Sequence, residues 1–273
     1  MKFIILGCGS SMGVPRPDGY FGNCDPKNKK NYRTRCSALI KSKTENILID
    51  TSPDLRQQLL RHNIRKIDKV FYSHMHADQT HGINDLRSFF INSRKQINVF
   101  ADYATSKYLK NNFSYCFKKK YDYEPILKLR KLKKRFKFFL SNKPINFLSI
   151  PVKHGLINSI AYIIDNKVAY LSDANEIPLK DIKHFKKLKY LIIDCLRIKK
   201  HPSHFSLNEV IKLFEILKPK KMILTNLHSD LDYDTLLNIL PKNIKPAYDG
   251  LSINFLYEKK KDFDYRWSWF CRF

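Results

Sequence analysis

Residues 74–82 read His-Met-His-Ala-Asp-Gln-Thr-His-Gly, so three imidazoles and one carboxylate stand together directly after a short apolar run. The apolar run predicts a strand that ends where the histidines begin. In an extended chain His74 and His76 point the same way, because side chains alternate along a strand. If a helix begins near Asp78, that residue and His81 share one face of it. The segment therefore predicts a metal site built from imidazole and carboxylate groups.

Polar residues also follow other predicted strands farther along the chain. Predicted strands over residues 146–151, 167–172 and 221–225 precede His154, Asp173 and His228. Because chemistry in α/β sheets collects in loops beyond one edge, we expect these side chains to converge with His74 and His76. His204 stands in a loop bordered by serine and is also a candidate. The histidines expected on the surface are His62, His184 and His201.

Short strands alternate with helices along the chain, which is typical of an α/β fold. Further strands are predicted over residues 2–6, 37–40, 45–50, 69–72, 97–101, 159–165, 190–194 and 251–258. Helices are predicted over residues 52–62, 105–113 and 206–217. Ser52 is the expected N-cap of the first, followed by Pro53, and Ser206 with Glu209 forms a capping box for the last. No linker rich in Ser and Gly divides the chain, so residues 1–257 form one predicted domain.

The chain is strongly basic. Its 273 residues include 51 lysines and arginines against 25 aspartates and glutamates, a formal net charge of +26. Lys, Asn, Ile, Phe and Tyr are all abundant, as an AT-rich genome would encode, so much of this charge is explained as solvated surface. The alternative is a field that attracts polyanions. The densest basic run, residues 118–137, interleaves Tyr121, Tyr123, Phe136 and Phe138 and is the candidate for a nucleic-acid contact.

Composition also bounds the class of protein. Hydrophobic residues make up 43% of the chain, which is enough for a buried core. No apolar run approaches the ~18 residues of a membrane-spanning helix, so we expect no membrane contact. The apolar stretch at residues 3–6 is shorter than the ~7–15 residues of a signal peptide. Six widely spaced cysteines do not suggest a disulfide framework, and we expect a cytoplasmic protein with reduced thiols.

Residues 258–273 form a separate aromatic tail. The side chains that alternate along it are Phe263, Tyr265, Trp267, Trp269, Cys271 and Phe273. A period of two with one wholly apolar face predicts a β-strand. This strand either folds back onto its own domain as an edge strand or pairs with a partner, for which a homodimer is the simplest case.

Four further stretches accompany the histidine cluster: Gly9-Ser-Ser-Met-Gly-Val-Pro15, Leu48-Ile-Asp50-Thr-Ser-Pro-Asp54, His201-Pro-Ser-His204-Phe-Ser206 and Ala247-Tyr-Asp-Gly250. With these stretches and the order of its polar residues, the chain resembles the metallo-β-lactamase fold over residues 1–257. The stretches are similar to those of one branch, the phosphoribosyl 1,2-cyclic phosphate phosphodiesterases, which is itself similar to the tRNA 3′-end endonucleases. The resemblance implies a four-layer αβ/βα sandwich with metal ions at one end of its two sheets.

The resemblance also implies a set of metal ligands. It places one divalent ion on His74, His76 and His154, a second on Asp78 and His228, and Asp173 between the two. The family has another metal-binding histidine directly after the motif aspartate, where this chain has Gln79. Three outcomes are then open: His81 swings in, Gln79 binds weakly through its carbonyl oxygen, or the second site is loosely occupied. Both zinc and manganese suit these ligands, and the sequence does not choose between them.

Catalytic roles follow from the same resemblance. His204 is the implied general acid or phosphate-stabilising donor, and Asp78 and Asp173 are the implied catalytic carboxylates. Asp50 is expected to orient a ligand histidine rather than to act on the substrate. The early loop has Cys24 without a nearby second cysteine, so no structural zinc is predicted there.

These features favour a metal-dependent hydrolase of a small, cyclic phosphodiester, in which two divalent ions activate the attacking water and clamp the attacking and leaving oxygens. The first alternative is an RNA-processing endonuclease of the tRNA 3′-end type, which the basic run supports. The second is a non-catalytic binding module with a degenerate metal site, for which Gln79 is the only support. A thioester or β-lactam hydrolase uses the same metals, but the loop motifs resemble the phosphodiesterase branch more.

Overall fold

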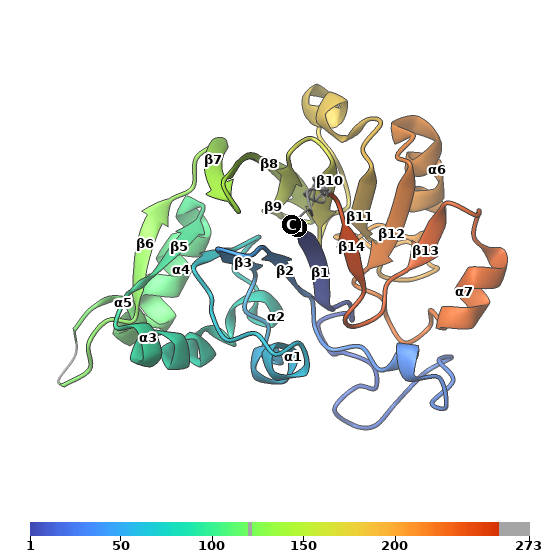
Figure 1. Cartoon of the computed structure of the whole chain (residues 1–273). Coiled ribbons are helices and arrows are strands. Elements are labelled where there is room, and N and C mark those ends of the chain that lie inside the picture. The colour runs from blue at the N-terminus through green and yellow to red at the C-terminus, as the bar shows by residue number, and fades with distance from the viewer. Residues whose placement is uncertain (120–121, 257–273) are drawn as a thin grey trace, which may run out of the picture.

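Two mixed β-sheets form the centre of the molecule, in a computed structural model that describes residues 1–119 and 122–256 (Figure 1). The strands of the first sheet are β1 (Lys2–Gly7), β2 (Ser37–Lys41), β3 (Asn46–Ile49), β4 (Lys69–Phe71), β5 (Ile97–Ala101), β6 (Leu127–Lys131) and β14 (Ser252–Asn254). Those of the second are β7 (Arg135–Leu140), β8 (Lys143–His154), β9 (Ile157–Ile164), β10 (Val168–Leu171), β11 (Tyr190–Asp194), β12 (Lys221–Thr225) and β13 (Ile244–Pro246). Their spatial orders are β14-β1-β2-β3-β4-β5-β6 and β13-β12-β11-β10-β9-β8-β7.

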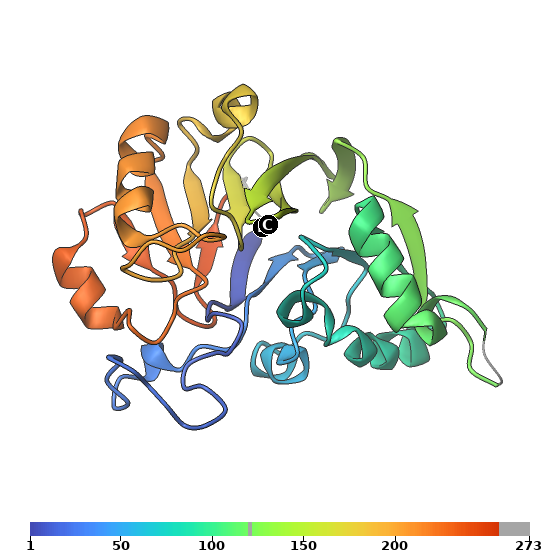
Figure 2. The same ribbon diagram turned by 180° about the vertical axis from the view of Figure 1, so that it is seen from behind.

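Helices cover the outer side of each sheet, and Figure 2 shows the same arrangement from behind. Those beside the first sheet are α1 (Leu55–Arg61), α2 (Ala77–Thr80), α3 (Arg87–Ser93), α4 (Tyr103–Asn112) and α5 (Ser114–Phe117). Those beside the second are α6 (Leu207–Leu217) and α7 (Tyr233–Ile239). Short 3₁₀ helices are η1 (Lys29–Asn31), η2 (Ile83–Leu86) and η3 (Leu179–Phe185). The order of layers is helix, sheet, sheet, helix, which confirms the predicted four-layer αβ/βα sandwich.

Aromatic side chains fill the space between the two sheets. Phe71 of β4 stacks on Phe100 of β5 with ring centroids 4.6 Å apart, and on Phe147 of β8 at 5.6 Å. Phe71 and Phe147 are both buried. A further apolar cluster lies between the first sheet and its helices, and another lies between the second sheet and its helices. Burial of apolar surface on both faces of each sheet is what holds the four layers together.

The basic run over residues 118–137 is not a single surface stripe. Its second half forms β6 and β7, which are edge strands of the two different sheets. Phe136 and Phe138 of β7 are half-buried, and their rings lie 5.5 and 5.9 Å from that of Phe71. The expectation that these two rings interleave with the lysines on a nucleic-acid surface is therefore wrong, because strand alternation sends them to the inter-sheet core. Tyr123, in contrast, is 52% exposed.

The first predicted helix begins later than expected. α1 starts at Leu55, and the Ser52 hydroxyl accepts a hydrogen bond from the backbone N–H of Asp54 at 3.0 Å in the preceding turn. The Asp54 carboxylate binds the Arg35 guanidinium, with Nε at 2.8 Å and Nη2 at 2.6 Å. Because the carboxylate is committed to Arg35, it makes no capping bond to the helix.

Several other elements match the sequence-based expectations. β5, β11 and β12 have the predicted bounds. The predicted capping box opens α6, where Glu209 accepts hydrogen bonds from the backbone N–H and the hydroxyl of Ser206 at 2.9 and 2.6 Å. The elements without a sequence-based prediction are β6, β7, β13, α3, α5 and α7.

Two sequence-based expectations concern residues that the structure does not describe. The tail strand over residues 258–273 and Tyr121 both lie outside the described ranges. Within those ranges, none of the helices combines the length and the apolar character that crossing a bilayer requires.

Candidate metal centre

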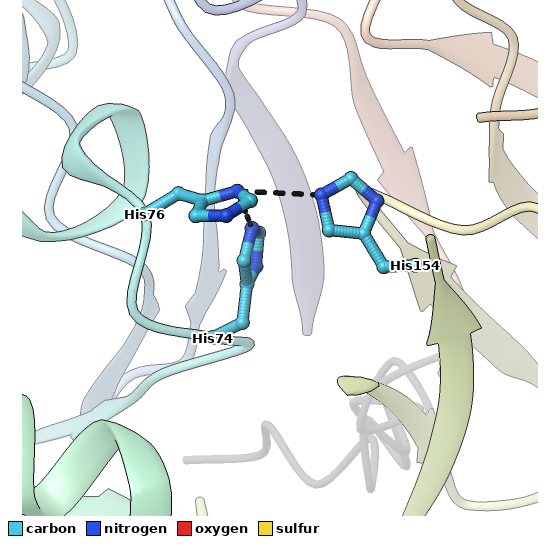
Figure 3. Close-up of side chains that lie close together, drawn as sticks. All are labelled: His74, His76 and His154. Atoms are coloured by element: carbon cyan, nitrogen blue, oxygen red, sulfur yellow. Dashed lines mark hydrogen bonds between the residues drawn. The ribbon is translucent and has the colours of Figure 1, made fainter. Parts of the chain in front are cut away.

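Three histidines from both sheets meet beyond the ends of β4 and β8 (Figure 3). His74 lies in the loop after β4, His76 is the N-cap of α2, and His154 is the last residue of β8. His76 Nδ1 lies 2.9 Å from His74 Nε2 and 3.3 Å from His154 Nε2. One nitrogen of each ring therefore faces a shared centre, as the strand-end pattern predicted.

Contacts behind the rings fix which nitrogen faces the centre. His154 Nδ1 lies 2.7 Å from the carbonyl oxygen of Ser203, so Nδ1 donates its proton and Nε2 keeps a lone pair. His74 Nδ1 lies 3.0 Å from the Ser73 hydroxyl. Asp50 accepts the backbone N–H of Ser73 at 2.7 Å. Asp50 thus positions the backbone that precedes His74, and the expected contact between Asp50 and a ligand imidazole is not what holds the ring.

The environment disfavours the charged form of all three rings. Burial lowers the pKa of His154 to about 4, and the nearby His204 adds to the effect. Burial also lowers the pKa of His74 well below its ordinary value, and that of His76 to a lesser degree. A neutral imidazole offers a lone pair to a cation, whereas an imidazolium does not. Because one nitrogen from each ring lies within 4.8 Å of the others, the trio fits a divalent ion.

Asp173 and His204 extend this group. One ligand atom each from His154, Asp173 and His204 also lie within 4.8 Å of one another. Burial raises the pKa of Asp173, and the charge of Asp78 raises it further. A buried carboxylate of this kind is costly unless hydrogen bonds or a cation compensate it, and Asn226 Nδ2 donates to its Oδ1 at 3.2 Å. Imidazole with carboxylate is a donor set that zinc and manganese both accept.

A second carboxylate holds His204 in place. Asp194, the last residue of β11, is fully buried and accepts hydrogen bonds from His204 Nδ1 at 2.7 Å and from the backbone N–H of Ala174 at 2.8 Å. Burial by itself would lower the pKa of His204, but the charge and the hydrogen bond of Asp194 outweigh it and raise the pKa to about 9. His204 is therefore a charged hydrogen-bond donor whose ring centroid lies 4.7 Å from that of His154.

Asp194 and Asn226 are site residues that the sequence reasoning missed. Asn226 Nδ2 lies 3.2 Å from both Asp173 Oδ1 and Asp194 Oδ1, so one amide joins two buried carboxylates. Asp194 ends the buried strand β11, and Asn226 directly follows β12. A polar residue at the end of a buried strand was the signal that found Asp173, and the same signal could have found these two residues.

His81 turns away from the centre. It is exposed, its Nε2 lies 3.0 Å from the Tyr108 hydroxyl, and its ring centroid is 5.5 Å from that of Phe113. α2 is a single turn that ends with His81 as its C-cap, so the shared helical face expected for Asp78 and His81 does not form. The structure does not bring His81 to the three histidines.

Asp78 and His228 border the centre without joining the groups described above. Asp78 lies in α2, and its Oδ2 accepts a hydrogen bond from Gln79 Nε2 at 3.1 Å. Burial raises the pKa of Asp78. His228 Nδ1 lies 3.0 Å from Asp230 Oδ1 in the loop after β12. Neither side chain contributes an atom to the two close groups of candidate ligands among the described residues.

Residues 45–226 match the model of the beta-lactamase superfamily domain. A curated protein named octanoyltransferase, from Porphyromonas gingivalis, is 33% identical over 255 residues, which cover 92% of this chain and 51% of that protein. The chain thus spans about half the length of that relative.

Solved structures share the architecture over nearly the whole chain. A new diphosphatase from the PhnP family is 30% identical, with a TM-score of 0.83 over 93% of this chain and 98% of that one. Human tRNase Z, short form, is 14% identical and shares the fold, with a TM-score of 0.66 over 94% of this chain and 100% of that one. By its matching domain model, its identity with the diphosphatase and its two-sheet sandwich, the chain belongs to the beta-lactamase superfamily and is a hydrolase of the metallo-β-lactamase fold.

Proposed function

We propose that the protein is a metal-dependent phosphodiesterase that acts on a small, cyclic phosphodiester. The observation that carries this proposal is a pair of close groups that share His154: His74, His76 and His154 form one, and His154, Asp173 and His204 form the other. A divalent ion held there, zinc or manganese, would act as a Lewis acid that lowers the pKa of water and polarises a phosphoryl oxygen. The name of the diphosphatase relative supports phosphate-ester chemistry over β-lactam or thioester chemistry.

His204 is the proposed proton or hydrogen-bond donor to the phosphate. Asp194 holds its Nδ1, and no hydrogen bond to Nε2 occurs within the described part of the chain, so Nε2 can face a substrate. A charged donor beside the centre favours the charge that develops on the phosphoryl oxygens in the transition state. The same donor can protonate the leaving oxygen when the ring bond of a cyclic diester breaks.

A cationic cavity of about 890 Å³ supports an anionic substrate. The charged residues that line it are Lys110, Arg130, Lys131, Lys133, Lys134, Lys180 and Lys183, together with Asp102 and Asp181. Ile160 also lines the cavity, and its backbone N–H donates at 2.9 Å to the carbonyl oxygen of Ser73, the residue before His74. The buried Ser149 hydroxyl on the cavity wall has no partner among the described residues. None of the candidate metal ligands lines this cavity, so its excess positive charge acts by raising the local concentration of phosphate esters rather than by direct contact with the reacting phosphate.

Hydrolysis of bis-p-nitrophenyl phosphate and of a nucleoside 2′,3′-cyclic phosphate tests the function. We expect turnover with added Mn²⁺ or Zn²⁺, a loss of roughly 100-fold or more after dialysis against a chelator, and recovery on metal addition, because the ion supplies the Lewis acid. A folded, metal-loaded protein that hydrolyses neither diester contradicts the proposal. If the protein hydrolyses a thioester or a β-lactam in the same experiment and neither diester, those compounds replace phosphodiesters as the proposed substrate class.

An RNA-processing endonuclease is the second candidate, and the cationic cavity favours it. The cavity includes Lys131, Lys133 and Lys134 from the basic run, and these side chains are exposed. We expect RNA affinity to fall steeply as the salt concentration rises. The paired change Lys133→Ser with Lys134→Ser should make this dependence less steep, because about one counterion fewer is released for each phosphate that has lost its lysine. Filter binding measures both effects.

A matched control for the RNA experiment is the paired change Lys212→Ser with Lys242→Ser. Both lysines are exposed and neither lines the cavity. The control pair removes the same net charge, so an equal loss of RNA affinity in both pairs would show only a general charge effect. Binding that does not respond to salt would contradict the RNA candidate.

A further inference from the structure

Gln79 lies between the two carboxylates of the centre. It is fully buried in α2, and its side-chain Nε2 donates hydrogen bonds to Asp78 Oδ2 and to Asp173 Oδ2, both at 3.1 Å. Its backbone carbonyl oxygen accepts the N–H of Thr51 at 2.7 Å, which fixes α2 against the loop after β3. Gln79 is therefore held by its side-chain NH₂ and by its backbone carbonyl, whereas its side-chain Oε1 is buried and has no hydrogen-bond partner among the described residues.

The partners determine the orientation of this amide. An ionised carboxylate only accepts hydrogen bonds, so the group that faces Asp78 and Asp173 must donate. The amide NH₂ has two donors and can satisfy one oxygen of each carboxylate, whereas the amide oxygen would be repelled by both. Gln79 thus directs its side-chain NH₂, which cannot coordinate a cation, toward Asp78 and Asp173.

Asp173 is buried and Asp78 is half-buried, and one side-chain nitrogen reaches an oxygen of each, so the two carboxylates are close enough to repel each other. A cation between them would compensate the repulsion by charge. The Gln79 amide donates one hydrogen bond to each carboxylate and adds no charge, so it offsets the repulsion between the two carboxylates without a metal ion.

Other donors that a second ion would need do not gather beside Asp78 in the described residues. His81 is paired with the Tyr108 hydroxyl, and His228, whose Nδ1 lies 3.0 Å from Asp230, has only Nε2 to offer. Neither belongs to the two close groups of candidate ligands in the described residues, whereas the three histidines lie within 4.8 Å of one another. The residues present fit one divalent ion at the three histidines and do not fit a second beside Asp78.

We infer that this protein binds one divalent ion, at His74, His76 and His154, and that the side-chain amide of Gln79 takes the position between Asp78 and Asp173 that a second ion would occupy. The inference uses the metal centre of the proposed function but depends only on metal stoichiometry. One ion rather than two leaves the reaction without a second Lewis acid, so His204, whose ring centroid lies 4.7 Å from that of His154, is the remaining donor for an anionic substrate.

Metal content of the whole chain tests this inference. The wild type, Gln79→His, Gln79→Ala and His81→Ala are stripped with a chelator, saturated with Mn²⁺ or Zn²⁺ and freed of unbound metal by gel filtration. Metal per chain is then measured by plasma mass spectrometry and by native mass spectrometry. We expect one ion in the wild type, in Gln79→Ala and in His81→Ala, and two in Gln79→His, because the new imidazole supplies a donor where the amide NH₂ had none. A magnetically coupled manganese pair in electron paramagnetic resonance should occur in Gln79→His alone.

Several results would overturn the inference. Two ions in the wild type contradict it directly, and a fall from two to one in His81→Ala would assign the second site to His81. One ion in a folded Gln79→His protein would show that the residue at this position does not set the stoichiometry. Circular dichroism and melting temperature establish that each variant is folded, and the wild-type stoichiometry stands whether or not a variant folds.

Failure of this inference and failure of the proposed function are distinguishable. A chain that binds one ion but hydrolyses no phosphodiester would keep the stoichiometry and reject the function. A chain that binds two ions and hydrolyses a diester would reject the stoichiometry and keep the function.

Discussion

Replacing His74 with alanine is expected to release the bound ion and to lower kcat/KM for a phosphodiester by roughly 10³-fold, which corresponds to about 4 kcal/mol of lost transition-state stabilisation. His74 is buried, and its Nε2 faces His76 Nδ1 at 2.9 Å. Without it only two imidazoles of the trio remain, too few to hold a divalent ion against water. Metal analysis and steady-state kinetics on the same protein sample measure the two losses together.

The matched control is His81→Ala. His81 comes from the same short segment, but it is exposed and contacts Tyr108 and Phe113. We expect this change to leave metal content and kcat/KM unaltered. Equal losses in the two variants, or full activity in His74→Ala with its metal retained, would show that the three histidines are not the metal centre.

Asp194→Asn is expected to lower kcat by roughly 10²-fold while the metal content stays the same, because a carboxylate that orients a working imidazole contributes 10- to 10⁴-fold. Asp194 accepts the Nδ1 proton of His204 at 2.7 Å. Asparagine keeps the size of the side chain, but it removes the charge and offers an NH₂ that competes for the same nitrogen. His204 then loses its positive charge, so its Nε2–H becomes a weaker hydrogen-bond donor and a weaker acid.

The control for Asp194→Asn is Asp85→Asn. Asp85 is a partly buried carboxylate that, like Asp194, accepts a backbone N–H, here that of Arg56 at 3.1 Å, but it lies outside the centre. We expect kcat to be unchanged in this variant. If Asp194→Asn changes KM or melting temperature without changing kcat, then Asp194 has only a structural role and His204 is not the donor.

The sequence pattern could predict that His74, His76 and His154 lie close together because the information is local. His74, His76 and His154 each stand at the end of a strand, and strands of a layered sheet deliver their ends to one edge. Asp194 and Asn226 also stand at strand ends, but each is a single polar residue after an apolar segment, with no motif around it to suggest a function. Their roles appear only when β10, β11 and β12 lie side by side.

Other elements could not be predicted because tertiary contacts override local signals. The helical spacing of Asp78 and His81 suggested a shared face, but α2 ends after one turn and Tyr108 of α4 binds His81. β6 and β7 are difficult to predict because lysines and arginines occupy most of their exposed positions. The abundance of positive charge obscures the alternation of apolar and polar residues that indicates a strand. The inward rings of Phe136 and Phe138 were the signal of a strand that faces a core.

The division of the trio between the two sheets determines when the protein can acquire its ion. His74 and His76 leave the ribosome with strands β1 to β6 of the first sheet, whereas His154 arrives later, at the end of β8 in the second. A nascent chain that ends at β6 has only two of the three imidazoles, which is too few to retain a divalent ion. An ion held by all three histidines would therefore be retained only after the two halves have docked, and it would resist their separation by mass action.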